Sequence, residues 1–487
     1  IVFSITLITV IESLLSIKAV DKLDPKKRRS NVNKDLRALG LASVVSGFLG
    51  GLNVVTVIAR SSVNTNNGGT NRSANFFHAV FLVLFVAIAW ILVDQYLLCP
   101  HYSFTDPRPF HGEKIVNPYA DANFNDVSTA NFHAHTKSWG GLTNGKGNSS
   151  DVWQRYDSLG HTFHALSQYH KIDTFNKEKQ NYVPVYEHGY NLKKTHQLVI
   201  GAKRVVWKDY IFPQTLHNKQ FILHEMAKDT NNLVVLNHPA VRSGYDVNDL
   251  KLLHYYDHIE LLNPSAQSFA HWDTALTAGK KIFVVGNDDN HNIFNDNAIG
   301  RFTTLIFGAA SDSKKMIDRM KKGQSVAVWL PQIHNETLES KRSKLLNLRS
   351  LISGISLMDS MLAINLSKSV AEIRVIGHHG KLKLKQRNIS SLTFPFSQND
   401  AYLRVELYLE DGTKLYLNPI FRDIAEGNQG RNLIATNYIS RDRTNPLMES
   451  FALASMIGIF VSVRNVKKRK NMRIKDMNID TTGMSLG

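Results

Sequence analysis

The chain has 487 residues, more than a single domain usually holds, so about two to four structural units are expected. Its formal net charge is +17 and its isoelectric point is near 9.6. The basic residues concentrate in two tracts, 26–29 and 464–475, beside apolar segments, which is typical of a membrane protein's cytoplasmic side and argues against nucleic acid as a partner. The lone cysteine, Cys99, excludes an intrachain disulfide and a cysteine-rich zinc site.

Residues 1–98 contain three apolar stretches that predict membrane helices, at residues 1–20, 39–58 and 76–93. The third has about the eighteen residues that are needed to cross a bilayer. The basic segment 24–37 should stay in the cytoplasm and therefore orients the helices on either side of it. Because the chain starts without methionine inside an apolar stretch, we expect that a preceding portion is missing.

An ordered series of short motifs runs through this membrane segment. The motifs are E-S-L-L-S at residues 12–16, D-K-L-D-P at 21–25, N-K-D-L at 33–36, S-G-F-L-G-G-L at 46–52 and R-S-S-V-N at 60–64. Together they resemble the SulP family of inorganic anion transporters. The resemblance implies that Arg60 and Ser61 lie at a broken helix whose end faces an inorganic anion, as helix N-termini do at many anion sites. Because most of the family's membrane segments are absent, transport by this segment alone is not expected.

The composition changes after the membrane segment. Residues 99–130 are polar and contain prolines, which predicts a linker. Residues 131–331 then alternate short apolar strands with amphipathic helices. The expected strands are 198–200, 233–236, 258–262, 282–285 and 303–307, and the expected helices are 219–229 and 268–278. This alternation is typical of parallel strands joined by crossover helices, so a barrel-like α/β domain is predicted.

Two further segments follow this domain. Residues 340–440 predict a small β module, because residues 362–376 and 402–409 alternate apolar and polar side chains and Asp411-Gly412 forms a hairpin turn. Residues 447–487 contain an apolar stretch, 447–463, followed by the basic tail. That stretch lies at the lower limit of length for a membrane helix, so spanning and not spanning are equally expected.

Potential metal ligands follow several of the predicted strands. His133 and His135 alternate along an extended segment, so their side chains can reach one point together. Other strands end in His238, in Asp289 and His291 with Asp288, and in Glu260 with Asn263. Imidazole and carboxylate groups suit zinc, manganese or iron, and α/β barrels place catalytic groups at the carboxyl ends of their strands. The sequence therefore predicts a catalytic centre for one to two divalent metal ions.

Three motifs of this region occur in the order of a known family. They are H-x-H at residues 133–135, H-P at 238–239 and D-x-H at 289–291. Together they are similar to the PHP family, the polymerase and histidinol phosphatase superfamily, over residues 130–330. The resemblance implies a distorted (β/α)7 barrel that carries metal ions and mostly hydrolyses phosphoesters. The ligands that it implies are His133, His135, His238, Asp289 and His291.

Two positions depart from the family's motifs. Ser167-Gln168-Tyr169 stands where members often carry an acid and an imidazole, and Gly201-Ala202-Lys203 stands where they read G-x-E. A protonated lysine cannot bind a metal, so Lys203 is predicted to bind the anionic group of a substrate instead. The candidate replacement ligands are Glu187, His188 and His170.

The predicted function is a membrane-tethered, metal-dependent hydrolase that attacks a small phosphorylated or ester substrate with metal-activated water. His238 or Asp289 is an alternative general base, since one sequence does not separate a ligand from a proton acceptor. The charge pattern places the hydrolase domain in the periplasm or otherwise outside the cytoplasm. The alternative is a truncated SulP-type transporter of sulfate or another inorganic anion, fused to a non-catalytic PHP-like binding domain. The abrupt junction near residues 87–93 also permits a different account, in which two neighbouring genes are joined by a deletion or by an assembly error.

Overall fold

The computed structural model describes residues 2–48, 54, 58–69, 73–104, 106–423 and 440–441, and these fall into two units. The first unit holds the described residues up to Val93, and the second begins at Asp94. The apolar stretch 447–463 and the basic tail 464–475, both singled out in the sequence, lie outside the described residues. So does part of the stretch 39–58.

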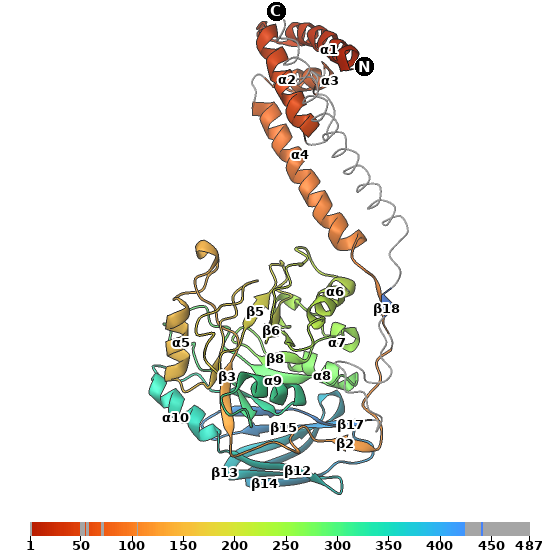
Figure 1. The fold of residues 1–487 in the computed structure, drawn as a ribbon. Helices are drawn as coiled ribbons and strands as arrows, with labels where there is room; N and C mark the ends of the chain where they lie inside the picture. Colours follow the sequence, from red (N-terminus) through yellow and green to blue (C-terminus); the bar gives the residue numbers. More distant parts are fainter. Residues whose placement is uncertain are drawn as a thin grey trace, which may run out of the picture. The chain divides into compact units, whose positions relative to one another are not determined.

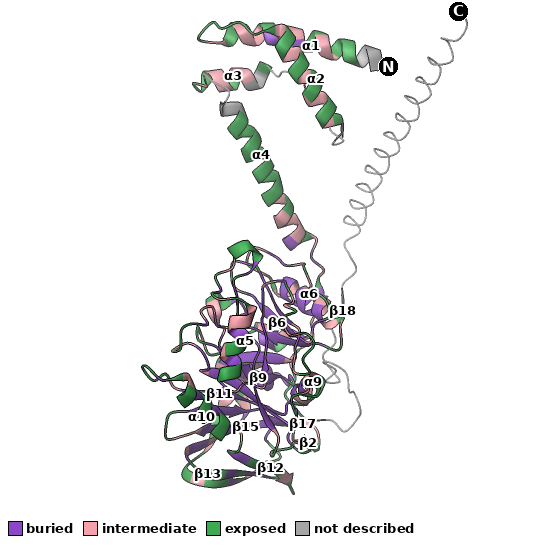
Figure 2. Ribbon diagram, turned by 60° about the vertical axis from the view of Figure 1, so that its left-hand side comes forward, coloured by how far each residue is buried: buried purple, intermediate pink, exposed green. Residues whose placement is uncertain are grey.

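The first unit is helical. Its helices are α1 (Val2–Leu23), α2 (Val32–Phe48), α3 (Ile58–Asn66) and α4 (Ser73–Leu92) (Figure 1). Among the described residues, one helix is long and apolar enough to cross a membrane, Phe76–Leu97, with a mean hydropathy of 2.8. Its apolar side chains are largely exposed, as the colouring of α4 in Figure 2 shows. Such a surface is unfavourable in water and suits lipid.

The second unit opens with a π-helix (Val93–Leu97) and contains two large sheets. The five-stranded sheet has the order β5-β6-β7-β8-β9. Its strands are β5 (Val185–His188), β6 (Gln197–Ile200), β7 (Leu233–Leu236), β8 (His258–Leu262) and β9 (Phe283–Gly286). Every residue of these strands is buried, as the purple β6 and β9 in Figure 2 illustrate. Continuous apolar runs such as Leu233–Leu236 suit a sheet that is covered on both faces.

Strand direction in this sheet differs in part from the prediction. β7, β8 and β9 are parallel, and α7 (Asp249–Leu252) and α8 (Phe269–Thr277) lie in their connections, whereas α6 (Leu216–Ala227) lies between β6 and β7. β6 is antiparallel to both of its neighbours, β5 and β7. The expected all-parallel series was therefore wrong at β6, because a short connection from β5 leaves room for a hairpin and not for a crossover helix.

The eleven-stranded sheet contains the remaining large strands and follows the main order β12-β13-β15-β16-β11-β10-β3-β4. Its strands are β2 (Lys114–Val116), β3 (Val127–Asn131), β4 (Phe163–His164), β10 (Phe302–Phe307), β11 (Ser325–Trp329), β12 (Ile352–Met358), β13 (Met361–Ile376), β14 (Leu382–Pro395), β15 (Tyr402–Tyr408), β16 (Lys414–Leu417) and β17 (Ile420–Asp423). The predicted hairpin at Asp411-Gly412 joins β15 to β16. Because β16 also pairs with β11, the sheet of the β module continues into the sheet that carries β3.

The two sheets contact each other at β5 and at β9, the two edges of the five-stranded sheet, but no continuous ladder of backbone hydrogen bonds joins them among the described residues. A single bridge joins Tyr169 to Glu187 on one side. On the other side, the Gly286 amide donates to Thr304 Oγ1 at 3.1 Å. The larger strands of this mixed α/β unit are thus divided between two sheets, and the distorted (β/α)7 barrel remains a prediction. The remaining helices of eight or more residues are α5 (Ser149–Ser158), α9 (Ser313–Lys322) and α10 (Leu338–Leu348).

Candidate metal centre

The H-x-H segment lies directly after β3 and is fully buried. His133 and His135 expose 0% and 1% of their surface. Between them, Ala134 forms a bridge with Asn290, which keeps this backbone extended. Alternate side chains of an extended segment point to the same side, and the two imidazole centroids lie 5.1 Å apart. The segment therefore presents two histidines to one point, as predicted.

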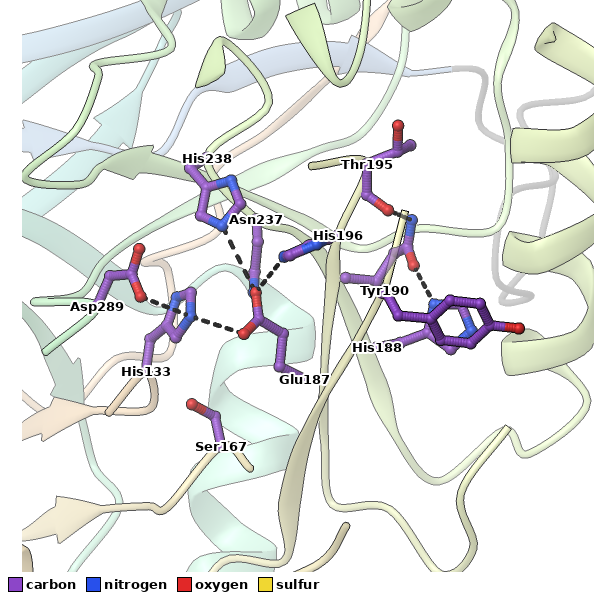
Figure 3. A network of polar contacts seen from close by, with 12 residues as sticks. His133, Ser167, Glu187, His188, Tyr190, Thr195, His196, Asn237, His238 and Asp289 are labelled. Atoms are coloured by element: carbon purple, nitrogen blue, oxygen red, sulfur yellow. Dashed lines mark hydrogen bonds and ion pairs between the residues drawn. The ribbon is translucent and has the colours of Figure 1, made fainter. Parts of the chain in front are cut away.

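Glu187 of β5 occupies the middle of the cluster (Figure 3). Its Oε2 lies 3.1 Å from His135 Nε2 and 3.5 Å from His133 Nε2. Its Oε1 lies 2.8 Å from His196 Nδ1 and 3.5 Å from His238 Nε2. One buried carboxylate therefore faces four imidazoles that come from different parts of the chain.

Asp289 is the second carboxylate of the cluster and follows β9. Its Oδ1 lies 3.1 Å from His133 Nε2, 3.4 Å from His135 Nε2 and 3.5 Å from His291 Nδ1. The ring of His291 lies 4.3 Å from that of His135. All five residues that the sequence motifs named are thus gathered around Glu187 and Asp289.

The ligand atoms form four overlapping groups of three, each with all its atoms within 4.8 Å of one another. The groups are His133, His135 and Glu187; His133, His238 and Asp289; His135, Asp289 and His291; and Glu187, His196 and His238. Several of these buried atoms have no hydrogen-bond partner: His133 Nε2, His135 Nδ1 and Nε2, His238 Nδ1 and Glu187 Oε2. Since buried polar atoms normally have partners, the cluster is compatible with a bound metal.

The tautomer of His133 strengthens this conclusion. Its Nδ1 lies 2.9 Å from Glu260 Oε1, and because a carboxylate only accepts, Nδ1 must donate. A neutral His133 then presents the lone pair of Nε2 to Asp289 and Glu187, whose oxygens also carry lone pairs. Only a proton or a cation between these atoms makes the contact favourable.

The neighbouring charges raise the pKa of His133 and lower the pKa of Glu187. Burial alone would lower the pKa of His133, but the charges of Asp289, Glu260 and Glu187 raise it well above its usual value. Burial acts against the ionised form of Glu187 as well, yet the facing imidazoles hold the pKa of this carboxyl well below its usual range. The cluster therefore favours ionised carboxylates that are matched by positive charge.

Glu260 of β8 supports the cluster from behind. Besides the bond from His133 Nδ1, it accepts hydrogen bonds from the His238 amide at 2.9 Å, Asn263 Nδ2 at 3.0 Å and Asn287 Nδ2 at 3.1 Å. Its two oxygens thus hold His133 and the backbone of His238 in fixed orientations. This is the usual arrangement of an outer carboxylate behind a ligand histidine.

The backbone around the cluster is strained. His238 and Asp289 adopt left-handed conformations, with φ of 28° and 43°. Such conformations cost about 1–3 kcal/mol for residues other than glycine and concentrate at functional sites. Gly189 has φ of 133°, and a Cβ there would collide with the ring of His196. Glycine is therefore required where β5 passes His196.

His188 is not part of the cluster, although the sequence named it as a candidate ligand. It alternates with Glu187 on β5, so its side chain points the other way. Its Nε2 donates to the Lys208 carbonyl at 2.9 Å, and it forms a separate buried group with His170 and Asp209. In that group His170 Nε2 accepts from the Gly189 amide at 3.1 Å.

Lys203, the predicted substrate-binding residue of the second unit, has no contact with the cluster. Lys203 is exposed and follows the carboxyl end of β6, which points away from the cluster because β6 is antiparallel to β7. Ser61 lies in α3 of the first unit, and the Arg60 side chain is outside the part of the chain that is described. Lys194 lies closer, with Nζ 5.8 Å from the centroid of Tyr169, whose ring stacks on His135 at 4.8 Å.

Comparison with known proteins gives a finding for each part of the chain. Residues 1–96 match the family model of the sulfate permease family. The N-terminal segment is SulP-like. YbaR of Bacillus subtilis (strain 168), named as a sulfate transporter, is 32% identical over 85 residues, which are 18% of this chain and 17% of the relative. The chain thus spans less than a fifth of that relative, and the likeness indicates an integral membrane protein.

A solved structure resembles a larger part of the chain. It is a two-domain protein from Bacteroides vulgatus ATCC 8482, described as containing a predicted PHP-like metal-dependent phosphoesterase. The match covers 67% of this chain and 93% of that one, with 12% sequence identity and a TM-score of 0.35. The sulfate permease match agrees with the family that the motifs in residues 12–64 resemble.

Proposed function

We propose that the second unit is a metal-dependent hydrolase of phosphoesters, which the helix Phe76–Leu97 anchors to a membrane. The observation that carries this proposal is the set of buried, unpartnered nitrogen and oxygen atoms that converge on Glu187 and Asp289. With Nδ1 donating to Glu260, a neutral His133 presents a lone pair to the lone pairs of Asp289 and Glu187, and a bound divalent cation would remove this repulsion.

One or two ions of zinc, manganese or iron would be held by the imidazole and carboxylate groups of the cluster. The ligands would be His133, His135, Glu187, His196, His238, Asp289 and His291. Such a cation supplies Lewis acidity and lowers the pKa of a bound water toward neutrality. Glu187 and Asp289 each belong to more than one group of three, which supports room for a second ion.

The chain's own residues give this centre its orientation and its preference for anions. Glu260 accepts a hydrogen bond from Nδ1 of His133 and so keeps Nε2 of that ring directed at the centre. Lys194, whose ammonium group lies over the ring of Tyr169, would bind a non-bridging oxygen of the phosphoester. His238 or Asp289 would act as a general base only if it did not bind the metal.

The finer organisation is part of the same proposal. We retain the division into residues 1–98, 99–130, 131–331, 340–440 and 447–487, with the two sheets of the third segment as an opened form of a distorted barrel. We also retain a location of the hydrolase outside the cytoplasm, which rests on the basic segment 24–37.

The experiment is metal analysis and phosphodiesterase assay of the whole chain in detergent. We expect purified protein to contain about one or two divalent ions per chain and to hydrolyse bis(4-nitrophenyl) phosphate. His135→Asn should lose metal and at least roughly 100-fold in activity. His334→Asn is the matched control, because His334 is exposed. A metal-free, inactive wild type after supply of each metal would contradict the proposal, as would a His135→Asn protein that keeps both properties.

A second function is favoured by the sulfate permease match to residues 1–96. In this alternative, the first unit belongs to an anion transporter and the second unit binds a ligand without turnover. Uptake of labelled sulfate into vesicles containing the whole chain would support it, provided that Arg60→Ala abolishes the uptake. Uptake that survives Arg60→Ala would remove this mechanism.

A further inference from the structure

Large apolar side chains are exposed on loops of the second unit, beside the metal centre. They are Trp139 (45% exposed), Leu142 (91%), Tyr190 (51%), Leu192 (58%) and Trp207 (60%), and we call this set the aromatic rim. The rings of Trp139 and Trp207 meet edge to face, with centroids 6.0 Å apart. Several exposed large apolar groups in one place usually mark a binding surface.

The aromatic rim contacts residues that pack against the metal centre. Trp139 Nε1 donates to the Tyr169 carbonyl at 2.7 Å, and the ring of Tyr169 stacks on His135. On the other side of the rim, Trp207 stacks on His170 with centroids 5.6 Å apart. Whatever covers the rim is therefore next to His135.

The rim is also fixed to the residues where the membrane helix ends. Gln95, near the end of Phe76–Leu97, donates to the Phe212 carbonyl at 2.9 Å and accepts from the Phe212 amide at 3.0 Å. The loop that carries Phe212 also carries Trp207, and its Ile211 carbonyl accepts from the Leu192 amide at 3.0 Å. Within the second unit, the end of the apolar helix and the rim are thus held by one loop.

The charges on this loop suit an anionic surface. Lys193 and Arg204 are exposed beside the rim. The neighbouring acids are already engaged: Asp94 pairs with Lys208, and Asp209 accepts from the Tyr190 amide at 2.8 Å. Basic residues near an anionic bilayer are attracted to it, and tryptophan and tyrosine prefer the headgroup level.

We propose that the aromatic rim lies in the headgroup layer of an anionic bilayer. The occupant follows from the chain itself, because the residues that leave the membrane are hydrogen-bonded to the loop that bears the rim. Leu142 and Leu192 enter the layer, the tryptophans and Tyr190 lie at its level, and Lys193 and Arg204 face lipid phosphates. The metal centre consequently lies close to the membrane surface. This proposal concerns binding alone and does not depend on hydrolysis.

The test uses the whole chain in nanodiscs of phosphatidylglycerol or of phosphatidylcholine. A nitroxide is attached to Leu142→Cys or, as a control, to Met358→Cys, both in a Cys99→Ser background. Met358 is 72% exposed and lies on β12 of the other sheet. Collision with oxygen, which enters lipid, is compared with collision with a water-soluble nickel chelate.

We expect an oxygen-to-nickel ratio several-fold higher at position 142 than at 358 in phosphatidylglycerol, and a smaller difference in phosphatidylcholine. Lys193→Glu with Arg204→Glu should reduce the ratio at 142 in phosphatidylglycerol. Equal ratios at 142 and 358 in both lipids would overturn the proposal. So would a high ratio at 142 that is the same in both lipids and insensitive to the two charge reversals.

Discussion

Glu260 acts on the centre through other residues, because both of its oxygens are occupied by hydrogen-bond donors. It accepts from His133 Nδ1, the His238 amide, Asn263 and Asn287. In Glu260→Gln, one oxygen becomes an amide that faces these donors, so at least one bond is lost. We expect metal affinity to fall about 10–100-fold, measured by competition with a zinc chelator. Glu225→Gln, at a surface pair with Lys228, is the control and should change nothing.

A change confined to the unfolding midpoint of Glu260→Gln, with metal affinity intact, would show that Glu260 serves folding alone. Loss of one buried hydrogen bond to a charged group costs about 1.5–3 kcal/mol, so both readouts are needed to separate the two roles.

Two lysines give opposite expectations for substrate binding. Lys203 was predicted from the sequence to bind the anionic group, but Lys194 lies over Tyr169 at the centre. Lys194→Gln should raise KM for a phosphodiester about tenfold and leave metal content unchanged, because it removes one charged hydrogen bond to substrate. Lys203→Gln should leave KM as it is. If Lys203→Gln raised KM in steady-state kinetics and Lys194→Gln did not, Lys203 would be the substrate-binding residue, as the sequence predicted.

At the scale of elements, strand direction explains which ligands the sequence could predict. His133, His238 and Asp289 follow strands, and an apolar strand with a polar end is visible as a pattern. His196 was missed because it precedes β6, and only the antiparallel direction of β6 brings its start to the centre. Glu187 remained one of several candidates, because no local pattern distinguishes its side of β5 from that of His188. The positions of His196 and Glu187 both depend on how distant strands pair, and the periodicity of a single segment does not encode that pairing.

Gly189 tests whether the β5–β6 hairpin shapes the centre. Alanine there must adopt φ of 133° and displace His196. We expect Gly189→Ala to lower the free energy of unfolding by about 1–3 kcal/mol and to weaken metal binding, measured by urea unfolding and zinc titration. Gly354→Ala is matched, since its nearest non-local neighbour is 3.8 Å away and its φ is ordinary. Equal behaviour of the two variants would contradict this role.

β8 carries a buried histidine that should make stability depend on pH. Burial lowers the pKa of His258 to about 3, partly offset by a hydrogen bond with the Met320 backbone. Below pH 6.5, His258 binds a proton in the unfolded chain but stays neutral in the folded chain. The contribution of His258 is therefore complete above pH 6.5 and is lost as pH falls toward 3, at up to about 1.4 kcal/mol per pH unit. His258→Leu should make urea-unfolding stability less steep between pH 6.5 and 4.5, while other histidines such as His161 and His254, whose pKa burial also lowers to about 3, keep the rest of the slope.

The exposed His334 provides the comparison for that experiment. His334→Leu should keep the full pH dependence of the wild type, whatever its absolute stability. If His258→Leu shows the same steepness as His334→Leu, the uptake of protons must occur elsewhere.

At the scale of the whole molecule, composition and motifs predicted a membrane segment followed by an α/β unit, but not how the strands close. The apolar run in Phe76–Leu97 is continuous and needs no partner to be recognised. The β module was expected as a separate body, yet β16 pairs with β11 and makes one sheet with β3. Strands that pair in this way have similar alternations of apolar and polar residues, so the sequence pattern does not show which strand pairs with which.

Removal of metal should destabilise the second unit as a whole. The seven side chains of the proposed metal centre come from segments between residues 133 and 291, so a cation that bound them together would bind the folded state and not the unfolded chain. Binding at a free concentration of 100 times Kd stabilises by about 2.7 kcal/mol. A chelator should therefore lower the thermal midpoint followed by tryptophan fluorescence, and zinc or manganese should restore it. His135→Asn should respond less to both treatments; an equal response would place the bound metal elsewhere.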